Sequence, residues 1–66
     1  MIKGTVKFYN EKKGYGFITD DTGSDLFFHQ TDVKNNMILE KGDEVTLSTE
    51  QGKRGVKACD VEVING

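Results

Sequence analysis

The sequence has no proline and no tryptophan, and among its 66 residues it has one cysteine (Cys59) and one histidine (His29). A single cysteine cannot form an internal disulfide, and one cysteine with one histidine cannot supply the ligands of a structural zinc site. No apolar run is long enough for a signal peptide or for a membrane span. We therefore expect a cytoplasmic protein that uses no metal, no cofactor and no membrane.

Long helical segments are also missing, because no window longer than about ten residues keeps a helical apolar period. Instead, 8 glycines separate short segments rich in β-branched and aromatic residues. These segments predict five strands, at residues 4–10, 15–19, 25–29, 44–48 and 56–64. DDTGS and EQGKRG predict hairpin connections, and QTDV predicts one helical turn capped by Thr31 or Asp32. Five short strands favour a closed barrel, since closure leaves no exposed sheet edge.

Alternation along the strands predicts which side chains face the barrel interior. Ile18 points away from Tyr15 and Phe17, and Phe28 points away from Phe27. The predicted core comprises Val6, Ile18, Leu26, Phe28, Val33, Val45, Leu47, Val61 and Val63, with Cys59 as a small member of it. Several aromatic rings are then left outside this core.

The remaining rings share the outer face with cationic side chains. Lys7, Lys13 and His29 are poor core residues, and Phe8 and Tyr9 follow Lys7 directly in the first strand. Glycines 14 and 16 alternate with the rings, which suggests open access to them. Unpaired bases stack on such rings at roughly 1–3 kcal/mol per base while lysines neutralise phosphates. The pattern therefore favours a binder of single-stranded nucleic acid.

Other interpretations of the same face remain open. The rings can stabilise the sheet by cross-strand contacts, or they can form the core themselves. The net charge of −2 leaves a protein-interaction module as the second functional class. An enzyme is disfavoured, because His29 has no neighbouring serine or cysteine and the G-x-G at residues 14–16 leads into a strand. Asp20, Asp21 and Asp25 predict an acidic hairpin turn, since their spacing does not fit a calcium loop.

Two motifs carry a resemblance to a known family. K-G-Y-G-F-I at residues 13–18 resembles the first ribonucleoprotein motif, and L-F-F-H at residues 26–29 resembles the second, in the spacing of bacterial and archaeal cold-shock proteins. The whole segment 4–18 resembles the family's N-terminal signature, and the resemblance covers essentially the entire chain. It implies a five-stranded antiparallel OB-fold barrel with at most one short helical turn, forming a single cold-shock domain over residues 1–66. It also implies an RNA chaperone that binds single-stranded RNA and DNA with low sequence specificity, and we expect this chaperone to be a monomer.

The resemblance also implies roles for individual positions. The base-stacking residues would be Phe8, Tyr15, Phe17, Phe27 and His29, with Tyr9 at a further aromatic position of the family. The lysines facing phosphates would be Lys7 and Lys13, polar contacts would come from Asn10, Arg54 and Lys57, and Gln30 is a further predicted residue of the binding site. Strict alternation would turn Phe8 toward the core, so its place on the surface requires a bulge in the first strand.

This sequence departs from the family pattern at three places. Phe8 replaces the usual tryptophan, and Gln30 replaces the usual phenylalanine. The loop after Val33 is short and offers Met37 or Ile38 in place of an aromatic residue. We expect weaker binding than a family member with the full set of rings, or a shorter footprint on the nucleic acid.

Overall fold

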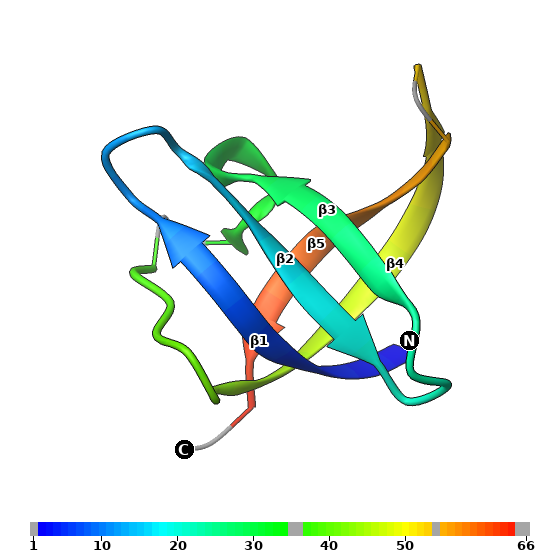
Figure 1. Ribbon diagram of the computed structural model, residues 1–66, viewed down its shortest axis with the longest axis horizontal. Helices are drawn as coiled ribbons and strands as arrows, with labels where there is room; N and C mark the ends of the chain where they lie inside the picture. Colours follow the sequence, from blue (N-terminus) through cyan, green and yellow to red (C-terminus); the bar gives the residue numbers. More distant parts are fainter. Residues whose placement is uncertain (1, 35–36, 54, 65–66) are drawn as a thin grey trace.

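The structure, a computed structural model, describes residues 2–34, 37–53 and 55–64. Its five strands and one 3-10 turn are β1 (Ile2–Asn10), β2 (Tyr15–Asp20), β3 (Asp25–His29), η1 (Gln30–Asp32), β4 (Glu44–Gly52) and β5 (Gly55–Val63). The strands close into a barrel in the order β1-β2-β3-β5-β4, with β4 pairing back onto β1 (Figure 1). Every pairing is antiparallel except the short parallel contact between β3 and β5. The predicted five-stranded OB-fold barrel is confirmed.

The β4–β5 hairpin is longer than the sequence predicted. We expected the connection to span EQGKRG, but the two strands stay paired out to Gly52 and Gly55. Glu50 faces Lys57 within this added length. Figure 1 shows the hairpin projecting well beyond the body of the barrel.

The barrel interior holds the predicted apolar core. The buried hydrophobic residues are Val6, Ile18, Leu26, Phe28, Val33, Leu39, Val45, Leu47, Ala58 and Val61. Val63, which was also predicted there, is partly buried and packs against this cluster. Leu39 and Ala58 were not predicted, since Leu39 lies in a loop and the neighbour of Ala58, Cys59, was predicted to be the core residue.

The prediction that Cys59 belongs to the core is wrong. Cys59 is half-buried, whereas its neighbour Ala58 is fully buried. Asp60 adopts a positive φ of 50° and interrupts the alternation between Ala58 and Val61. The β4–β5 register also shifts nearby, between Thr46 and Ser48. A one-residue irregularity exchanges inner and outer faces, which moves the thiol out of the interior.

A bulge in β1 resolves the conflict over Phe8. Val6 pairs with Ile18, but Phe8 pairs with Phe17, so one strand has an extra residue between these two pairs. The bulge turns Phe8 outward, where 39% of its surface is exposed. Gly16 lies on the inner face, where a Cβ atom would collide with the carbonyl oxygen of Phe8 and the ring behind it. The absence of a side chain at Gly16 therefore allows the bulged β1 strand to pack closely against β2. We had expected it to keep the outer rings accessible, and this expectation is wrong because Gly16 faces inward.

The turn η1 follows β3 directly and is capped differently from the prediction. His29 is its N-cap, and Asp32 closes a capping box by accepting the backbone N–H of His29 at 3.0 Å. Neither Thr31 nor Asp32 is the N-cap itself. In the part of the chain that the structure describes, no helix has the length and apolar character to cross a membrane.

Candidate nucleic-acid interface

Four aromatic rings touch one another on the outer face of β1, β2 and β3. Their centroids lie 5.9 Å apart for Phe8–Tyr15, Tyr15–Phe27 and Phe17–Phe27, and 6.4 Å apart for Tyr15–Phe17. Phe8 is 39% and Phe27 is 40% exposed, and the other two rings are half-buried. We call these four rings the aromatic platform. Large rings exposed together on a small protein mark a surface for binding.

The strand register explains how the rings come together. Phe8 pairs with Phe17, and Phe17 pairs with Phe27, so one ring from each strand lies in a row across the sheet. In the adjacent row Tyr15 pairs with His29. Directly paired residues point to the same side of a sheet. His29 therefore extends the platform at the end of β3.

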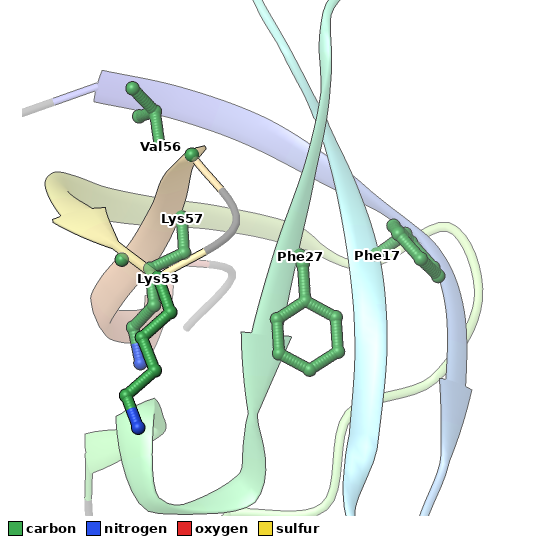
Figure 2. Close-up of a pocket in the computed structure, with 7 residues that line it drawn as sticks. Phe17, Phe27, Lys53, Val56 and Lys57 are labelled. Atoms are coloured by element: carbon green, nitrogen blue, oxygen red, sulfur yellow. The ribbon is translucent and has the colours of Figure 1, made fainter.

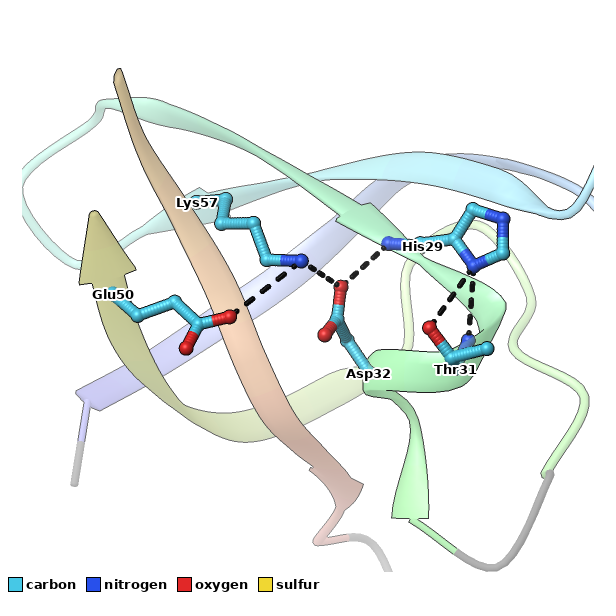
Figure 3. Close-up of polar contacts among 5 residues, drawn as sticks. All are labelled: His29, Thr31, Asp32, Glu50 and Lys57. Atoms are coloured by element: carbon cyan, nitrogen blue, oxygen red, sulfur yellow. Dashed lines mark hydrogen bonds and ion pairs between the residues drawn. The ribbon is translucent and has the colours of Figure 1, made fainter. Parts of the chain in front are cut away.

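The His29 ring is held in one orientation by the turn that follows it. Its Nδ1 atom accepts the backbone N–H of Thr31 at 3.2 Å, and the Thr31 hydroxyl lies 3.1 Å from the same atom (Figure 3). Because Nδ1 is an acceptor, the neutral ring carries its proton on Nε2. The group that the ring can offer to a ligand is thus an N–H donor.

Tyr9 does not lie on the aromatic platform, although we placed it beside Lys7 on the outer face. Its ring stacks on the core residue Phe28, with centroids 5.5 Å apart and an angle of 17° between the planes. The β1 bulge that turns Phe8 outward turns the next residue inward. The remaining surface of Tyr9 borders a hollow that it shares with Gln30 and Ile38. Tyr9 also lines a second hollow, which it shares with Lys7 and Phe8.

The two lysines predicted to face phosphates differ in their surroundings. Lys7 donates from Nζ to Asp25 at 2.7 Å, and Asp25 also accepts the Thr19 hydroxyl at 2.8 Å. The hydrogen bond from Lys7 holds the pKa of Asp25 below its usual value. Lys13 is exposed, and no ion pair involves it within the described ranges. The ammonium group of Lys13 is therefore accessible to a phosphate, whereas Lys7 would first have to break its ion pair with Asp25.

Asn10 and Gln30 flank the turn between β1 and β2. The side-chain oxygen of Asn10 accepts the backbone N–H of Lys13 at 3.1 Å, so this amide closes the turn. Gln30 is exposed, and its backbone N–H donates to the carbonyl of Gly14 at 2.8 Å. A Cβ added to Gly14 would lie 3.0 Å from the Gln30 side chain. Gln30 therefore lies over the turn, next to His29 at the edge of the platform.

Lys57 is engaged in ion pairs, and Arg54 lies outside the described residues. The Nζ atom of Lys57 is 2.9 Å from a carboxylate oxygen of Asp32 and 3.6 Å from one of Glu50. Its hydrogen bond to Asp32 raises the pKa of Lys57 above its usual value. Lys57 thus lies beside the platform as a protonated side chain whose positive charge is balanced by neighbouring carboxylates.

Comparison with known proteins agrees with this geometry. The sequence pattern of the 'Cold-shock' DNA-binding domain matches residues 2–64. The chain belongs to the cold-shock domain family. It is 40% identical over 63 residues to the major cold shock protein of Streptococcus pyogenes serotype M18, which covers 92% of this chain and 94% of that protein.

Two further cold-shock relatives show the same extent of similarity. Cold shock protein 2 of Lactiplantibacillus plantarum is 42% identical over 64 residues, covering 94% of this chain and 97% of the relative. Cold shock protein CspB of Bacillus caldolyticus is 44% identical over 63 residues, covering 92% and 96%. The predicted family is therefore confirmed, and it is a family of nucleic-acid-binding proteins.

The long hairpin brings Lys53 and Val56, which were not among the predicted site residues, close to the platform. A groove of about 500 Å³ separates the platform from the hairpin (Figure 2). It is lined by Phe17, Phe27, Gly52, Lys53, Gly55, Val56 and Lys57. Val56 is 54% exposed. This groove was not predicted, because it depends on strands that stay paired through a segment rich in turn residues.

Proposed function

We propose that this cold-shock domain binds single-stranded RNA and DNA by stacking bases on the aromatic platform and on His29. We further propose that residues 1–66 form one domain that acts in the cytoplasm as a monomeric RNA chaperone. The observation that carries the proposal is the cluster of four contacting rings on an outer sheet face, with Phe8 and Phe27 each about two-fifths exposed.

The energy of base stacking explains why the platform would favour unpaired bases. Stacking of a base on an aromatic side chain contributes roughly 1–3 kcal/mol and works with any base, because every base has a π face. Bases within a duplex are already stacked on each other, so they gain nothing from the platform. A protein that binds only unpaired bases competes with base pairing, which is the action of an RNA chaperone with low sequence specificity.

Tyrosine fluorescence provides the direct test. The sequence has no tryptophan and two tyrosines, so a Tyr9→Phe variant makes Tyr15 on the platform the single strong emitter. We expect quenching on titration with single-stranded oligo-dT and none with the matching duplex. Raising the salt concentration should weaken binding, with a log–log slope of about −0.7 per phosphate contact.

Two substitutions separate stacking from general apolar contact. Phe27→Ala should weaken binding about 5- to 150-fold, the equivalent of roughly 1–3 kcal/mol for one stacked base. Ile64→Ala is the matched control, because Ile64 is 39% exposed but borders a hollow beside Lys3 and Thr5. Equal affinity of Phe27→Ala and the parent protein, or the absence of binding, would refute the proposal. The platform would then serve a protein partner.

A further inference from the structure

The least exposed ion pair among the described residues lies beside the platform and not within it. The side chains of Lys57 and Asp32 are 26% and 12% exposed, whereas those of the Lys7–Asp25 pair are 58% and 43% exposed. Holding two charged groups away from water is costly unless both are paired and hydrogen-bonded. A pair in such a place needs a structural or functional reason.

A continuous set of contacts leads from Lys57 to the His29 ring. The Asp32 oxygen that accepts Lys57 Nζ at 2.9 Å also accepts the backbone N–H of His29 at 3.0 Å. Asp32 thereby closes the capping box of η1. The same turn directs the Thr31 N–H to Nδ1 of the imidazole at 3.2 Å. Figure 3 shows these groups in line, with Lys57 on β5 at one end and the ring at the other.

The barrel fixes the position of Lys57 independently of any ligand. Lys57 pairs with Phe27 in the one parallel contact between β3 and β5, and it faces Glu50 across the β4–β5 hairpin. Its ammonium group thus has a carboxylate on each side, Asp32 at 2.9 Å and Glu50 at 3.6 Å. A phosphate approaching this ammonium would meet two negative charges. These contacts argue against a direct phosphate contact for Lys57.

We propose that Lys57 is a positioning residue of the base-stacking site, which holds the His29 ring in place through Asp32 and the η1 turn. The proposal rests on the function proposed above and deepens it. It replaces the direct polar contact that the family resemblance implied for Lys57. Without Lys57, the shielded Asp32 carboxylate turns toward water, releases the His29 N–H and loosens the turn that orients the imidazole.

The main test is the affinity of the Lys57→Met protein for single-stranded oligo-dT across a range of salt concentrations. We expect a loss of about three- to tenfold, smaller than the loss on removing the stacking ring with His29→Ala. The salt slope should stay unchanged, since no phosphate contact is removed. Lys13→Met is the matched control with the same charge change, and its slope should become shallower by about 0.7.

A double-substitution cycle assigns the loss to the ring. In the His29→Ala background, Lys57→Met should cause no further loss, because there is no ring left to position. A Lys57→Arg variant keeps the cation next to Asp32 and should restore the parent affinity. The proposal is wrong if Lys57→Met leaves affinity unchanged, makes the slope shallower by about 0.7, or weakens the His29→Ala protein further.

A ligand-free measurement keeps this proposal separate from the proposed function. The ¹⁵N NMR spectrum of the imidazole should show the Nε2–H tautomer with a hydrogen-bonded Nδ1 in the parent protein, and a mixture of tautomers in Lys57→Met. Glu50→Gln removes the more distant carboxylate and should leave the spectrum as it is. Failure of the parent protein to bind oligo-dT would refute the function alone. An unaltered imidazole spectrum in a folded Lys57→Met protein would refute the positioning role.

Discussion

At the scale of single residues, the aromatic platform depends on Gly16, which has no side chain. Gly16 lies opposite the β1 bulge, and an added Cβ would collide with the carbonyl oxygen of Phe8 and lie 2.8 Å from the Phe28 ring. The carbonyl oxygen belongs to the β1 bulge that exposes the Phe8 ring, whereas the Phe28 ring fills the core. Gly16 therefore couples the platform to the interior.

The first prediction is that Gly16→Ala destabilises the protein by about 1–3 kcal/mol, as overpacking of a filled interior does. Urea denaturation measures the change. Gly52→Ala is the control with a milder approach, since a Cβ there would lie 3.2 Å from the carbonyl oxygen of Gly55 and 3.3 Å from the flexible stem of Lys57. Equal losses for the two variants would show that the close approach at Gly16 has no special importance.

A second residue-scale prediction concerns the hydroxyl of Thr46. This oxygen is buried and has no hydrogen-bond partner among the described residues. Thr46→Val replaces it with a methyl group of the same shape and should raise stability by about 1 kcal/mol, because an unsatisfied buried polar group is removed. The melting temperature should rise by about 4–8 °C for a domain of this size. Thr49→Val, at an exposed position, should show no such rise.

At the scale of the elements, periodicity predicted the regular strand segments, whereas the β1 bulge was expected only because the family resemblance placed Phe8 on the surface. In β2 and β3 the residues alternate without interruption, so Ile18 and Phe28 face inward and Phe17 and Phe27 outward as predicted. The errors follow backbone irregularities: Tyr9 comes after the β1 bulge, and Cys59 precedes the positive φ of Asp60. Sequence periodicity cannot locate a bulge, because a bulge shifts the period by one residue.

Contacts between elements were the least predictable part of the site. The residues of the platform come from motifs that lie close together in the sequence, and their types alone indicated stacking. The pairing of Lys57 with Asp32 joins β5 to η1 across 25 positions of the chain (57 minus 32). Such a pair depends on the barrel closing through β3 and β5, which no local pattern specifies. The same holds for the groove beneath the long hairpin.

The third prediction concerns the ion pair between β1 and β3. Asp25→Asn should release Lys7 for a phosphate, because its 2.7 Å partner loses its charge. Affinity for single-stranded oligo-dT should increase, and the salt slope should become steeper by about 0.7. Asp21→Asn is the control with the same charge change at an exposed turn residue. An equal gain in both variants would mean that net charge, and not release of Lys7, controls binding.

The fourth prediction concerns η1, where Gln30 lies beside His29 at the edge of the platform. Gln30→Phe should tighten oligonucleotide binding about fivefold or more, the equivalent of roughly 1 kcal/mol for an added stacking surface. Gln30→Ala removes the amide without adding a ring and should bring no such gain. If the phenylalanine variant binds no better than the alanine variant, position 30 does not face the bound strand.

At the scale of the whole molecule, the two turns that flank β2 differ in charge, although the protein as a whole has a net charge of −2. Exposed Lys12 and Lys13 lie in the turn between β1 and β2, whereas exposed Asp21 lies in the turn at the other end of β2. Figure 1 shows these two turns at opposite ends of the front sheet. Local potential governs the approach of a polyanion more than net charge does. We therefore expect a single strand to approach the platform from the end that carries Lys12 and Lys13.

The acidic end leads to the last prediction, which concerns unfolding at low pH. Asp20 accepts the Thr22 hydroxyl and the backbone N–H groups of Thr22 and Ser24, and these bonds hold its pKa below the usual value of 3.8. The pKa of Asp25 is lowered by Lys7. A lowered native pKa gives stability that is fully present above the unfolded value and disappears as the pH falls through the native value.

Stability should therefore decrease below about pH 4, near the unfolded carboxyl value. Asp20→Asn keeps an acceptor oxygen for the turn and removes only the charge. Urea denaturation should find this variant less stable than the parent protein at pH 7, and the difference should shrink as the pH falls below about 4 and Asp20 becomes protonated in the parent. A stability difference that stays constant from neutral to acid pH would show that Asp20 acts through the shape of its turn, and that its ionised form contributes nothing to the fold.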